Sequence, residues 1–412
     1  MEYIPRSTEP LVLAALADTP VVLVHGARQS GKSTLVRRIA EAEHPATYVT
    51  LDDAVVLAAA LGDAQGFLGG LSGSVVIDEV QRAPGLLLAI KAAVDRQRTP
   101  GRFLLTGSAH VLQLPRLSET LTGRMEIHTL WPLSQGELAR RRETFLDRLF
   151  DRDPAFDRPA PTSLPDLIGR AAAGGFPEAV SRTDPRRRSE WFSAYLSTVL
   201  AREVREVAEV EGRVALPRLM ALLAARVGGL ANYADLGRAS GIAKTSLIRY
   251  LAILETTFII IRLPAWSTNL SSRVSKSPKF YLCDTGLLSS LLHLDDSSAV
   301  RRGELLGALL ENFAVVELVK QASWHVSGPV LHHYRTYAGD EVDIVLEARG
   351  GAVAGVEVKA AATVAARDFR GLRSLAVGAG ESFASGVVLY TGTEVVPFGE
   401  RLWAVPFAAL WE

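Results

Sequence analysis

The sequence predicts an α/β protein whose first third is a parallel sheet with a phosphate-binding loop. Short apolar segments alternate with helical ones there, as they do in parallel α/β sheets, and a glycine-rich loop separates an apolar segment from a helical one. Because 412 residues exceed what one compact core holds, smaller modules are expected to follow. The predicted parts are the sheet (1–133), a helical region (134–210), a winged-helix module (211–266), a connector (267–302) and an α+β domain (303–412).

Apolar runs and turn signals set the expected elements of the sheet. The expected strands are Val21–His25, Thr47–Leu51, Ser74–Ile77, Phe103–Thr106 and Met125–Leu130. Helices are expected at Lys32–Glu43 and Leu86–Arg96, since glycine-rich or polar turns bound both segments. From Ser134 the pattern is helical and arginine-rich, and after a helix at Glu304–Gln321 it alternates as strands do.

Composition narrows the class of protein. Acidic and basic residues balance at 45 each, so contacts with nucleic acid would have to come from local basic patches rather than from net charge. The single cysteine, Cys283, excludes an intrachain disulfide framework and a cysteine-rich zinc site. No secretory leader is evident at the N-terminus, and no apolar run approaches the roughly 20 residues of a membrane helix. We therefore expect a cytoplasmic protein with no membrane partner.

The segment Gly26–Ser33 fits the pattern G-x-x-x-x-G-K-[ST] between a strand and a helix. Glycines let backbone amides wrap phosphate oxygens, and the helix start adds a favourable dipole. Lys32 is expected to reach the β- and γ-phosphates of ATP, and the Ser33 hydroxyl to ligate Mg²⁺. A chance match in an ordinary strand–turn–helix is the alternative. The predicted nucleotide-binding residues are Gly26, Ala27, Arg28, Gln29, Ser30, Gly31, Lys32, Ser33 and Thr34.

A second motif, Val75–Glu79, is an apolar strand that ends in two carboxylates. We expect Asp78 to lie near the Mg²⁺ and Glu79 to orient or deprotonate the attacking water. Solvated acids at a strand end are the alternative. Thr106 and Ser108, at the end of another strand, are candidates to hydrogen-bond the γ-phosphate or the water, unless they form a simple polar turn.

Arg124 directly precedes the last strand of the predicted sheet. An arginine at that edge faces away from its own ATP site and is placed to enter a neighbour's, where it would stabilise charge on the transferring phosphate. This interpretation requires an oligomer. A surface arginine that caps a helix is the alternative.

These motifs resemble those of the AAA-plus-like P-loop ATPases of bacteria and archaea that carry a C-terminal domain of unknown function. The resemblance extends over nearly the whole chain. The stretches that carry it are Gly26–Leu35, Val75–Pro84, Phe103–Ala109, Leu121–Pro132, Gly174–Glu178, Ser277–Tyr281 and Asp284–Leu287. It implies an ATPase core, a helical lid, a winged-helix module and a nuclease-like terminal fold. It also implies that Pro177 belongs to a lid element beside the adenine, with a tight turn between lid helices as the alternative.

The predicted winged-helix module begins with a short helix capped by Asn232, followed by a turn at Gly241 and a second helix over Lys244–Leu251. Apolar spacing predicts one buried face on that helix, formed by Leu247, Ile248, Leu251 and Leu254. The exposed residues expected to meet DNA are Lys244, Thr245, Ser246 and Arg249. A structural lid or a protein contact is the alternative, and the connector residues Arg273, Lys276 and Lys279 would be further phosphate contacts or a solvated loop.

The C-terminal part contains an acid on a helix, Glu311, then Asp343 on one strand, then Glu357 and Lys359 two apart on the next. This order resembles the PD-(D/E)XK nuclease core, in which carboxylates hold Mg²⁺ and the lysine orients or activates water. Carboxylates that are neutralised by Arg335 or Lys359 are the structural alternative.

Taken together, the patterns predict a homo-oligomeric ATPase, a ring such as a hexamer, that uses ATP and Mg²⁺ to translocate or remodel DNA, including branched DNA. A signalling ATPase that acts on a protein partner and an ATP-dependent nuclease are the alternatives.

Overall fold

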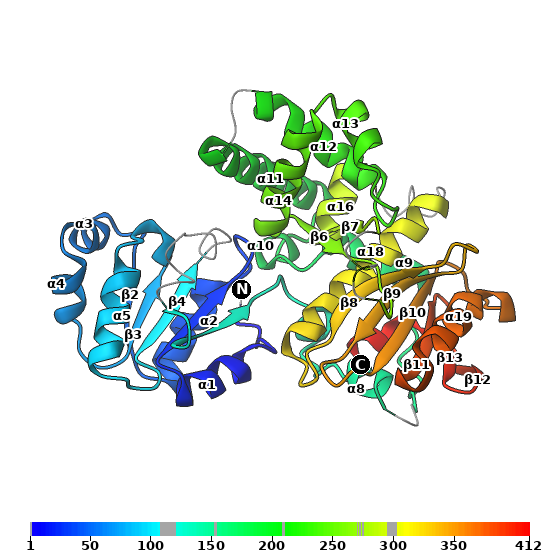
Figure 1. Cartoon of the computed structure of the whole chain (residues 1–412), viewed down its shortest axis with the longest axis horizontal. Helices are drawn as coiled ribbons and strands as arrows, with labels where there is room; N and C mark the ends of the chain where they lie inside the picture. The colour runs from blue at the N-terminus through cyan, green and yellow to red at the C-terminus, as the bar shows by residue number, and fades with distance from the viewer. Residues whose placement is uncertain are drawn as a thin grey trace. The chain divides into compact units, whose positions relative to one another are not determined.

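The computed structural model describes residues 2–107, 121–151, 155–207, 211–269, 271, 273, 276–294 and 303–412. The chain divides into two compact units, drawn in Figure 1. The N-terminal unit comprises Glu2–Leu133 and Thr256–Phe258, and the C-terminal unit comprises Ser134–Glu255 and Ile259–Glu412. Among the described helices, none is both long and apolar enough to cross a membrane.

The described strands of the N-terminal unit form one parallel sheet in the order β2-β3-β4-β1-β5. Its strands are β1 (Val21–His25), β2 (Thr47–Thr50), β3 (Val75–Asp78), β4 (Phe103–Gly107) and β5 (Met125–Thr129). Its helices are α1 (Glu9–Asp18), α2 (Lys32–Arg38) with a π-helical turn (Ile39–Glu43), α3 (Ala54–Gly62), α4 (Ala64–Gly69) and α5 (Leu86–Arg96). The predicted α/β class and its parallel sheet are thus confirmed.

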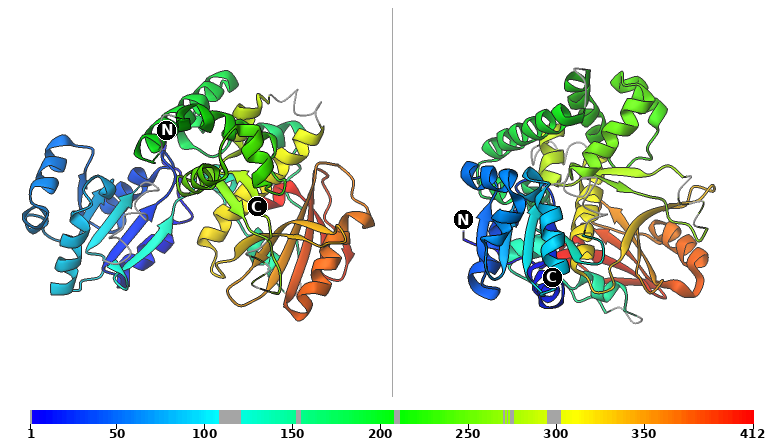
Figure 2. Two further views of the ribbon diagram at one scale, coloured as in Figure 1. Left: turned by 45° about the horizontal axis from the view of Figure 1, so that its top comes forward. Right: turned by 60° about the vertical axis from the view of Figure 1, so that its left-hand side comes forward.

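Both faces of this sheet are covered, which is why its central strands are apolar throughout. Val21 and Leu23 of β1 pack in a cluster with α3, α4 and α5. Val22 and Val24, which alternate with them, pack in a second cluster with α1 and α2. The two helical layers are visible in Figures 1 and 2. A rigid sheet of this kind presents the carboxyl ends of its strands, and the loops that follow them, along one edge.

The C-terminal unit begins with helices and a hairpin. The helices are α7 (Gln135–Ala139), α8 (Phe145–Leu149), α9 (Leu164–Ala173), α10 (Pro177–Val180), α11 (Pro185–Val207), α12 (Glu211–Ala225), α13 (Tyr233–Ser240), α14 (Lys244–Thr256) and α16 (Thr285–Leu292). The antiparallel hairpin joins β6 (Ile260–Leu263) to β7 (Lys279–Leu282). Two regular elements, β7 and α16, therefore lie within the stretch that we predicted as a connector.

The rest of the C-terminal unit is a helix, α18 (Gly303–Trp324), and a mixed sheet in the order β12-β13-β11-β10-β9-β8. The strands are β8 (Val330–Arg335), β9 (Glu341–Glu347), β10 (Val353–Lys359), β11 (Phe383–Tyr390), β12 (Val396–Gly399) and β13 (Leu402–Pro406). Helix α19 (Arg370–Ala379) packs along β9, β10 and β11 (Figure 2). A Cβ at Gly371 would lie 1.8 Å from the Glu341 carbonyl oxygen, so this close approach requires glycine.

The Gly174–Glu178 segment forms a tight turn that is fastened from a distant part of the chain. The buried Asp284 carboxylate caps α16 and also accepts a hydrogen bond from the Gly175 amide at 2.7 Å. Gly174 has φ +68°, and a Cβ there would lie 2.1 Å from Asp284 Oδ1. Phe176 is fully buried in an aromatic cluster that includes Tyr195. Two separate stretches of the resemblance, around Gly174 and around Asp284, are therefore one packing arrangement.

Candidate active site

The loop between β1 and α2 lies at the carboxyl edge of the N-terminal sheet. Gly26 (φ +153°) lies so close to the backbone that follows β5 that a Cβ on it would be 2.2 Å from the Leu130 carbonyl oxygen. Gly31 (φ +97°) makes the turn into α2, and Gln29 also adopts a positive φ, of 60°. The glycines of the motif are therefore required by the backbone path of the loop.

Lys32 is the first residue of α2, and its side chain is only 5% exposed. The Nζ atom donates hydrogen bonds to the carbonyl oxygens of Gly26 at 3.2 Å and Ala27 at 2.8 Å, so the ammonium group lies over the loop. Burial lowers the pKa of Lys32 to about 8, although the charges of Glu79 and Asp78 act in the opposite direction. An anionic ligand at the loop would favour the protonated amine.

Asp78, at the end of β3, has neighbours on both of its carboxylate oxygens. Ser33 Oγ donates to Oδ1 at 3.0 Å, and Tyr48 Oη donates to Oδ2 at 2.9 Å. Thr106 Oγ1 also donates to Oδ1, and Thr50 Oγ1 lies 3.4 Å from Oδ2. The structure thus brings together the two residues that we predicted as Mg²⁺ ligands, Ser33 and Asp78, and adds Tyr48, which the sequence analysis missed.

Thr106 links the Asp78 carboxylate to the backbone of Glu79. Its hydroxyl donates to Asp78, and the same oxygen accepts the backbone N–H of Glu79 at 2.9 Å. In this geometry its proton points to Asp78 rather than to a phosphate or a water, so it acts as a positioning residue. Glu79 has φ +61°, and its carboxylate accepts a hydrogen bond from the Gln81 amide. The other candidate from this strand end, Ser108, lies outside the described residues.

Arg6 holds the loop from outside and was also missed. Its guanidinium donates to the carbonyl oxygens of Ser30 at 2.9 Å and Trp131 at 2.6 Å. A single arginine twenty or so residues before the loop follows no spacing rule, and only tertiary structure identifies it. Tyr48 carried a weak signal, because it lies on a strand that was predicted to end near the site.

The residues at this edge fit a magnesium nucleotide. Ser30 Oγ, inside the loop, is buried without a hydrogen-bond partner among the described residues. The Ser33 and Asp78 oxygens supply the hard ligands that Mg²⁺ prefers. Beside them, a pocket of about 350 Å³ is lined by Tyr3, Ser33, Thr34, Arg37, Arg38 and Glu41.

Arg124 lies at the opposite edge of the sheet. It immediately precedes β5, whose first residue, Met125, pairs with Val21, whereas the loop follows the far end of β1. Its guanidinium forms an ion pair with Asp95 of α5 at 2.6 Å and donates to the Thr122 carbonyl oxygen at 3.2 Å. The side chain remains 29% exposed.

The predicted recognition helix corresponds to α14. Lys244, Thr245 and Arg249 are exposed, and Ser246 is half-buried. The predicted apolar face was wrong at Ile248, which is 51% exposed, because the helix buries Tyr250 and Ile253 in the core instead. Asn232 caps the preceding helix by accepting the Asp235 amide at 3.1 Å, as expected.

The C-terminal acids meet, but around Lys279, which the sequence analysis treated as either a phosphate contact or part of a solvated loop. Lys279 Nζ lies 3.1 Å from Glu311 Oε1 and 3.4 Å from Asp343 Oδ1. Glu357 is paired instead with Lys359 at 2.7 Å. Among the described residues, no group of three or more acids, histidines or cysteines has the geometry of a metal site. The predicted neutralisation by Arg335 or Lys359 therefore accounts for only part of the cluster.

Burial dominates the electrostatics of this cluster. It raises the pKa of Glu311 to about 7 and that of Glu357 to about 8, in both cases reinforced by the charge of Asp343. Burial lowers the pKa of Lys279, but Asp343, Glu311 and Glu341 together outweigh it and hold the pKa above its usual range. Lys279 is therefore a permanent cation at neutral pH.

The other connector lysine and arginine are engaged as well. Arg273 forms a bidentate pair with Glu347, and Lys276 Nζ lies 3.5 Å from the Arg335 carbonyl oxygen. Arg273 and Lys279 are thus paired with acids, which fits neither of the two alternatives, free phosphate contacts or a solvated loop.

Two curated proteins are 32% identical to this chain over 392 residues, which is 95% of this chain and 81% of theirs. They are the uncharacterized proteins Mb2031c of Mycobacterium bovis and Rv2008c of Mycobacterium tuberculosis. The chain belongs to their family. Residues 18–139 match an AAA domain, residues 164–298 a domain of unknown function (DUF8612), and residues 306–410 a domain of unknown function (DUF4143).

The N-terminal unit of this chain therefore has the fold of an AAA-type P-loop ATPase, as its sheet and loop indicate. Among solved structures, the Walker-type ATPase PABY2304 of Pyrococcus abyssi matches with a TM-score of 0.44 and 17% identity, over 71% of this chain and 96% of that one. A RuvB variant of Thermotoga maritima matches with a TM-score of 0.23 and 19% identity, over 62% and 88% of the two chains.

The lowered pKa of Lys32 predicts that Mg·ATP binding takes up a proton above pH 8. A bound triphosphate favours the protonated amine, so the affinity should fall by about tenfold per pH unit above the pKa of the ligand-free protein. Calorimetric titration at pH 9 in two buffers of different ionisation enthalpy measures the uptake. Lys32→Arg is the control, because a guanidinium keeps its proton at this pH. Binding at pH 9 with no net proton uptake by the wild type would contradict the account.

Proposed function

We propose that this protein hydrolyses ATP with Mg²⁺ at the carboxyl edge of the N-terminal sheet. The observation that carries the proposal is the convergence of Ser33 and Thr106 on Asp78, next to the buried ammonium of Lys32. Ser33 and Asp78 would hold the Mg²⁺, which neutralises phosphate charge when bound. Lys32 would leave its loop carbonyls to contact the β- and γ-phosphates.

Glu79 is the proposed general base. Glu79 follows Asp78 directly in the sequence. The hydrogen bond from its backbone N–H to Thr106 fixes the position of its Cα, and so the origin of the side chain. Glu79 would orient the attacking water and accept its proton. The pocket beside Ser33 and Thr34 is large enough for the nucleoside part of ATP. Pro177, the lid residue that the resemblance implies, starts α10 in the C-terminal unit.

We further propose that hydrolysis is coupled to binding and remodelling of DNA, including branched DNA. The order α12, α13, α14, β6, β7 is that of a winged-helix module. The isolated bridge between Leu230, which lies between α12 and α13, and Lys279 on β7 adds the short third strand of such a module. On α14, the exposed Lys244, Thr245 and Arg249 are of the kind that contacts phosphates and bases.

A signalling ATPase that acts on a protein partner is the second candidate. The observation that favours it is Ile248, which is 51% exposed in the middle of the outward face of α14. An exposed branched apolar side chain suits a protein contact better than a charged phosphate backbone.

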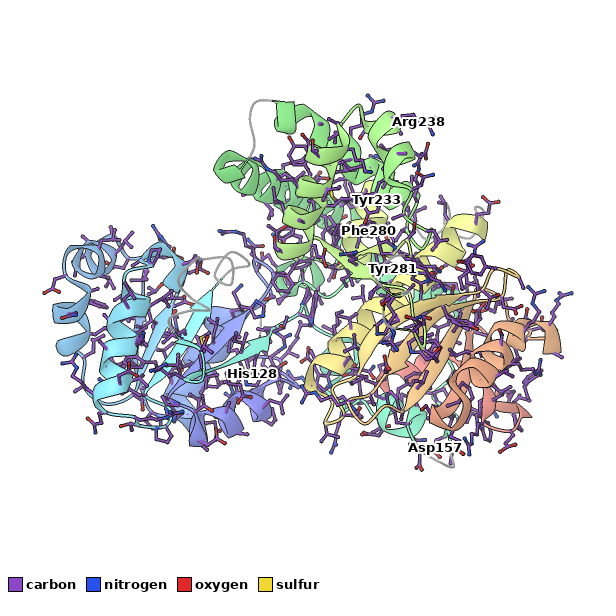
Figure 3. The ribbon with its side chains drawn as sticks, in the orientation of Figure 1. His128, Asp157, Tyr233, Arg238, Phe280 and Tyr281 are labelled. Carbon is purple, nitrogen blue, oxygen red and sulfur yellow. The ribbon has the colours of Figure 1, made fainter. Side chains whose placement is uncertain are left out.

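The steady-state ATPase rate with and without single-stranded, duplex and branched DNA tests the coupling. We expect at least one form to stimulate the rate by about tenfold at low salt, and less at moderate salt because phosphate contacts release counterions. Lys244→Ala with Arg249→Ala should remove the stimulation and leave the basal rate unchanged. Arg238→Ala, on α13 (Figure 3), is the matched control for loss of an exposed arginine. A rate that no DNA form changes would favour the protein-partner candidate.

Arg124 is proposed to act in trans within a homo-oligomeric ring, such as a hexamer. Its place at the edge of the sheet opposite to the loop, with part of its surface exposed, supports this role. In the complex it would exchange Asp95 for the phosphates of the neighbouring subunit.

Arg124→Ala should then reduce hydrolysis by at least about 100-fold without loss of ATP binding, because the transition-state charge loses its partner. Asp95→Asn removes the same ion pair but retains the arginine, and it should keep most of the activity. Mixing Arg124→Ala with Lys32→Ala subunits should restore part of the rate, since each supplies what the other lacks. Equal losses in the Arg124 and Asp95 variants, with no complementation, would mean that the pair is only structural.

A further inference from the structure

Lys279 lies at the centre of the C-terminal acids. Its ammonium is 2.9 Å from Glu341 Oε1, 3.1 Å from Glu311 Oε1 and 3.4 Å from Asp343 Oδ1. The side chain is only 2% exposed, although it comes from the hairpin and not from the sheet that carries Asp343. A buried charge of this kind is stable only with close counter-charges, and here three carboxylates supply them.

A second residue of β7, Tyr281, hydrogen-bonds the same oxygen of Glu311 that Lys279 contacts. Tyr281, two residues on and therefore on the same face of β7, donates its hydroxyl to Glu311 Oε1 at 2.6 Å (Tyr281 is labelled in Figure 3). Asp343 Oδ2 accepts the Val358 backbone N–H at 3.0 Å. One oxygen of Glu311 and both oxygens of Asp343 are thus already bound to groups of the protein.

With these contacts, the acids are not arranged to bind the divalent metal ion that the nuclease resemblance implies. Mg²⁺ requires near-octahedral oxygens at about 2.0–2.1 Å, so Glu311, Asp343 and Glu357 would have to converge on one point. Instead, Lys279 draws Glu311 and Asp343 to itself, while Glu357 faces Lys359. A second cation beside the buried ammonium would be repelled by it.

The hairpin is also fastened to this domain by its connection. The Trp266 amide donates to the His333 carbonyl oxygen at 2.6 Å, and the His333 amide donates to that of Pro264 at 2.9 Å, next to a parallel bridge between Ala265 and His333. Arg273 is paired with Glu347 of β9. The loop before Lys279 is therefore held to the sheet by backbone pairing at its start and by the Arg273–Glu347 ion pair, so Lys279 is not held in the cluster by its own ion pairs alone.

We infer that Lys279 is a resident cation that replaces the divalent ion of a nuclease-like site, and that it closes this site to metal. Under this inference the C-terminal domain does not cut DNA by metal-dependent hydrolysis. The acids serve instead to clamp the β6–β7 hairpin to the C-terminal sheet. The inference goes beyond the ATPase proposal and does not depend on it.

Manganese binding to the full chain tests the inference. Mn²⁺ is titrated without nucleotide, and free Mn²⁺ is followed by electron paramagnetic resonance in the wild type and in Asp343→Asn. We expect both proteins to bind the same number of ions, because Asp343 serves no metal in the wild type. An ion that the wild type binds and Asp343→Asn loses would overturn the inference, as would Mg²⁺-dependent DNA cleavage that is lost with Asp343.

Lys279→Met provides the gain-of-site arm, since it keeps the length of the side chain and removes the charge. We expect it to bind one more Mn²⁺ than the wild type and to be stabilised by Mn²⁺ in thermal unfolding, through mass action on the folded state. Asp343→Asn in the same chain should abolish both effects. Lys276→Met is the matched control from the same segment. A folded Lys279→Met protein that gains no ion would contradict the claim, and if this variant fails to fold, the comparison of wild type with Asp343→Asn still decides.

Discussion

The Asp78 carboxylate is the interaction on which the proposed site depends. Ser33 of α2 donates to one oxygen and Tyr48 of β2 to the other, and Thr106 of β4 links this carboxylate to the Glu79 amide. These groups come from separate elements, so the parallel sheet has to form before they meet. Because a buried carboxylate needs all its partners, the sheet and the site stabilise each other.

The C-terminal unit contains a comparable centre with the charges reversed. There a buried ammonium, Lys279, collects carboxylates from α18 and β9, and so holds the hairpin against the sheet. Under these two proposals, the resemblance to P-loop ATPases extends to function, whereas the resemblance to the nuclease core does not. We propose that the loop of the N-terminal unit uses Lys32, Ser33, Asp78 and Glu79 for ATP chemistry, and that the C-terminal acids have a structural purpose.

Much of the N-terminal fold could be predicted from the sequence, because its signals are local. The apolar strands, the glycines of the loop and the carboxylates of Asp78 and Glu79 follow spacing rules within short segments. The partners Tyr48, Arg6 and Lys279 could not be predicted, since each acts across a long sequence separation. Lys279 was placed in a connector because its neighbours are serines and basic residues, and neither of its two interpretations, a phosphate contact or a solvated loop, implied the burial that accompanies the pairing of β7 with β6. Ile248 was placed in the core by helical spacing, which does not distinguish the two sides of a short helix flanked by other apolar residues.

The central claim, that Glu79 activates water for ATP hydrolysis at this edge, is tested most directly by single-turnover hydrolysis in Glu79→Gln. The account predicts that this variant binds Mg·ATP with the affinity of the wild type but hydrolyses it at least about 100-fold more slowly, because an amide cannot accept the proton. Lys32→Ala, which should lose binding itself, separates a binding defect from a chemical one. Wild-type turnover by Glu79→Gln would contradict the account and would require another base.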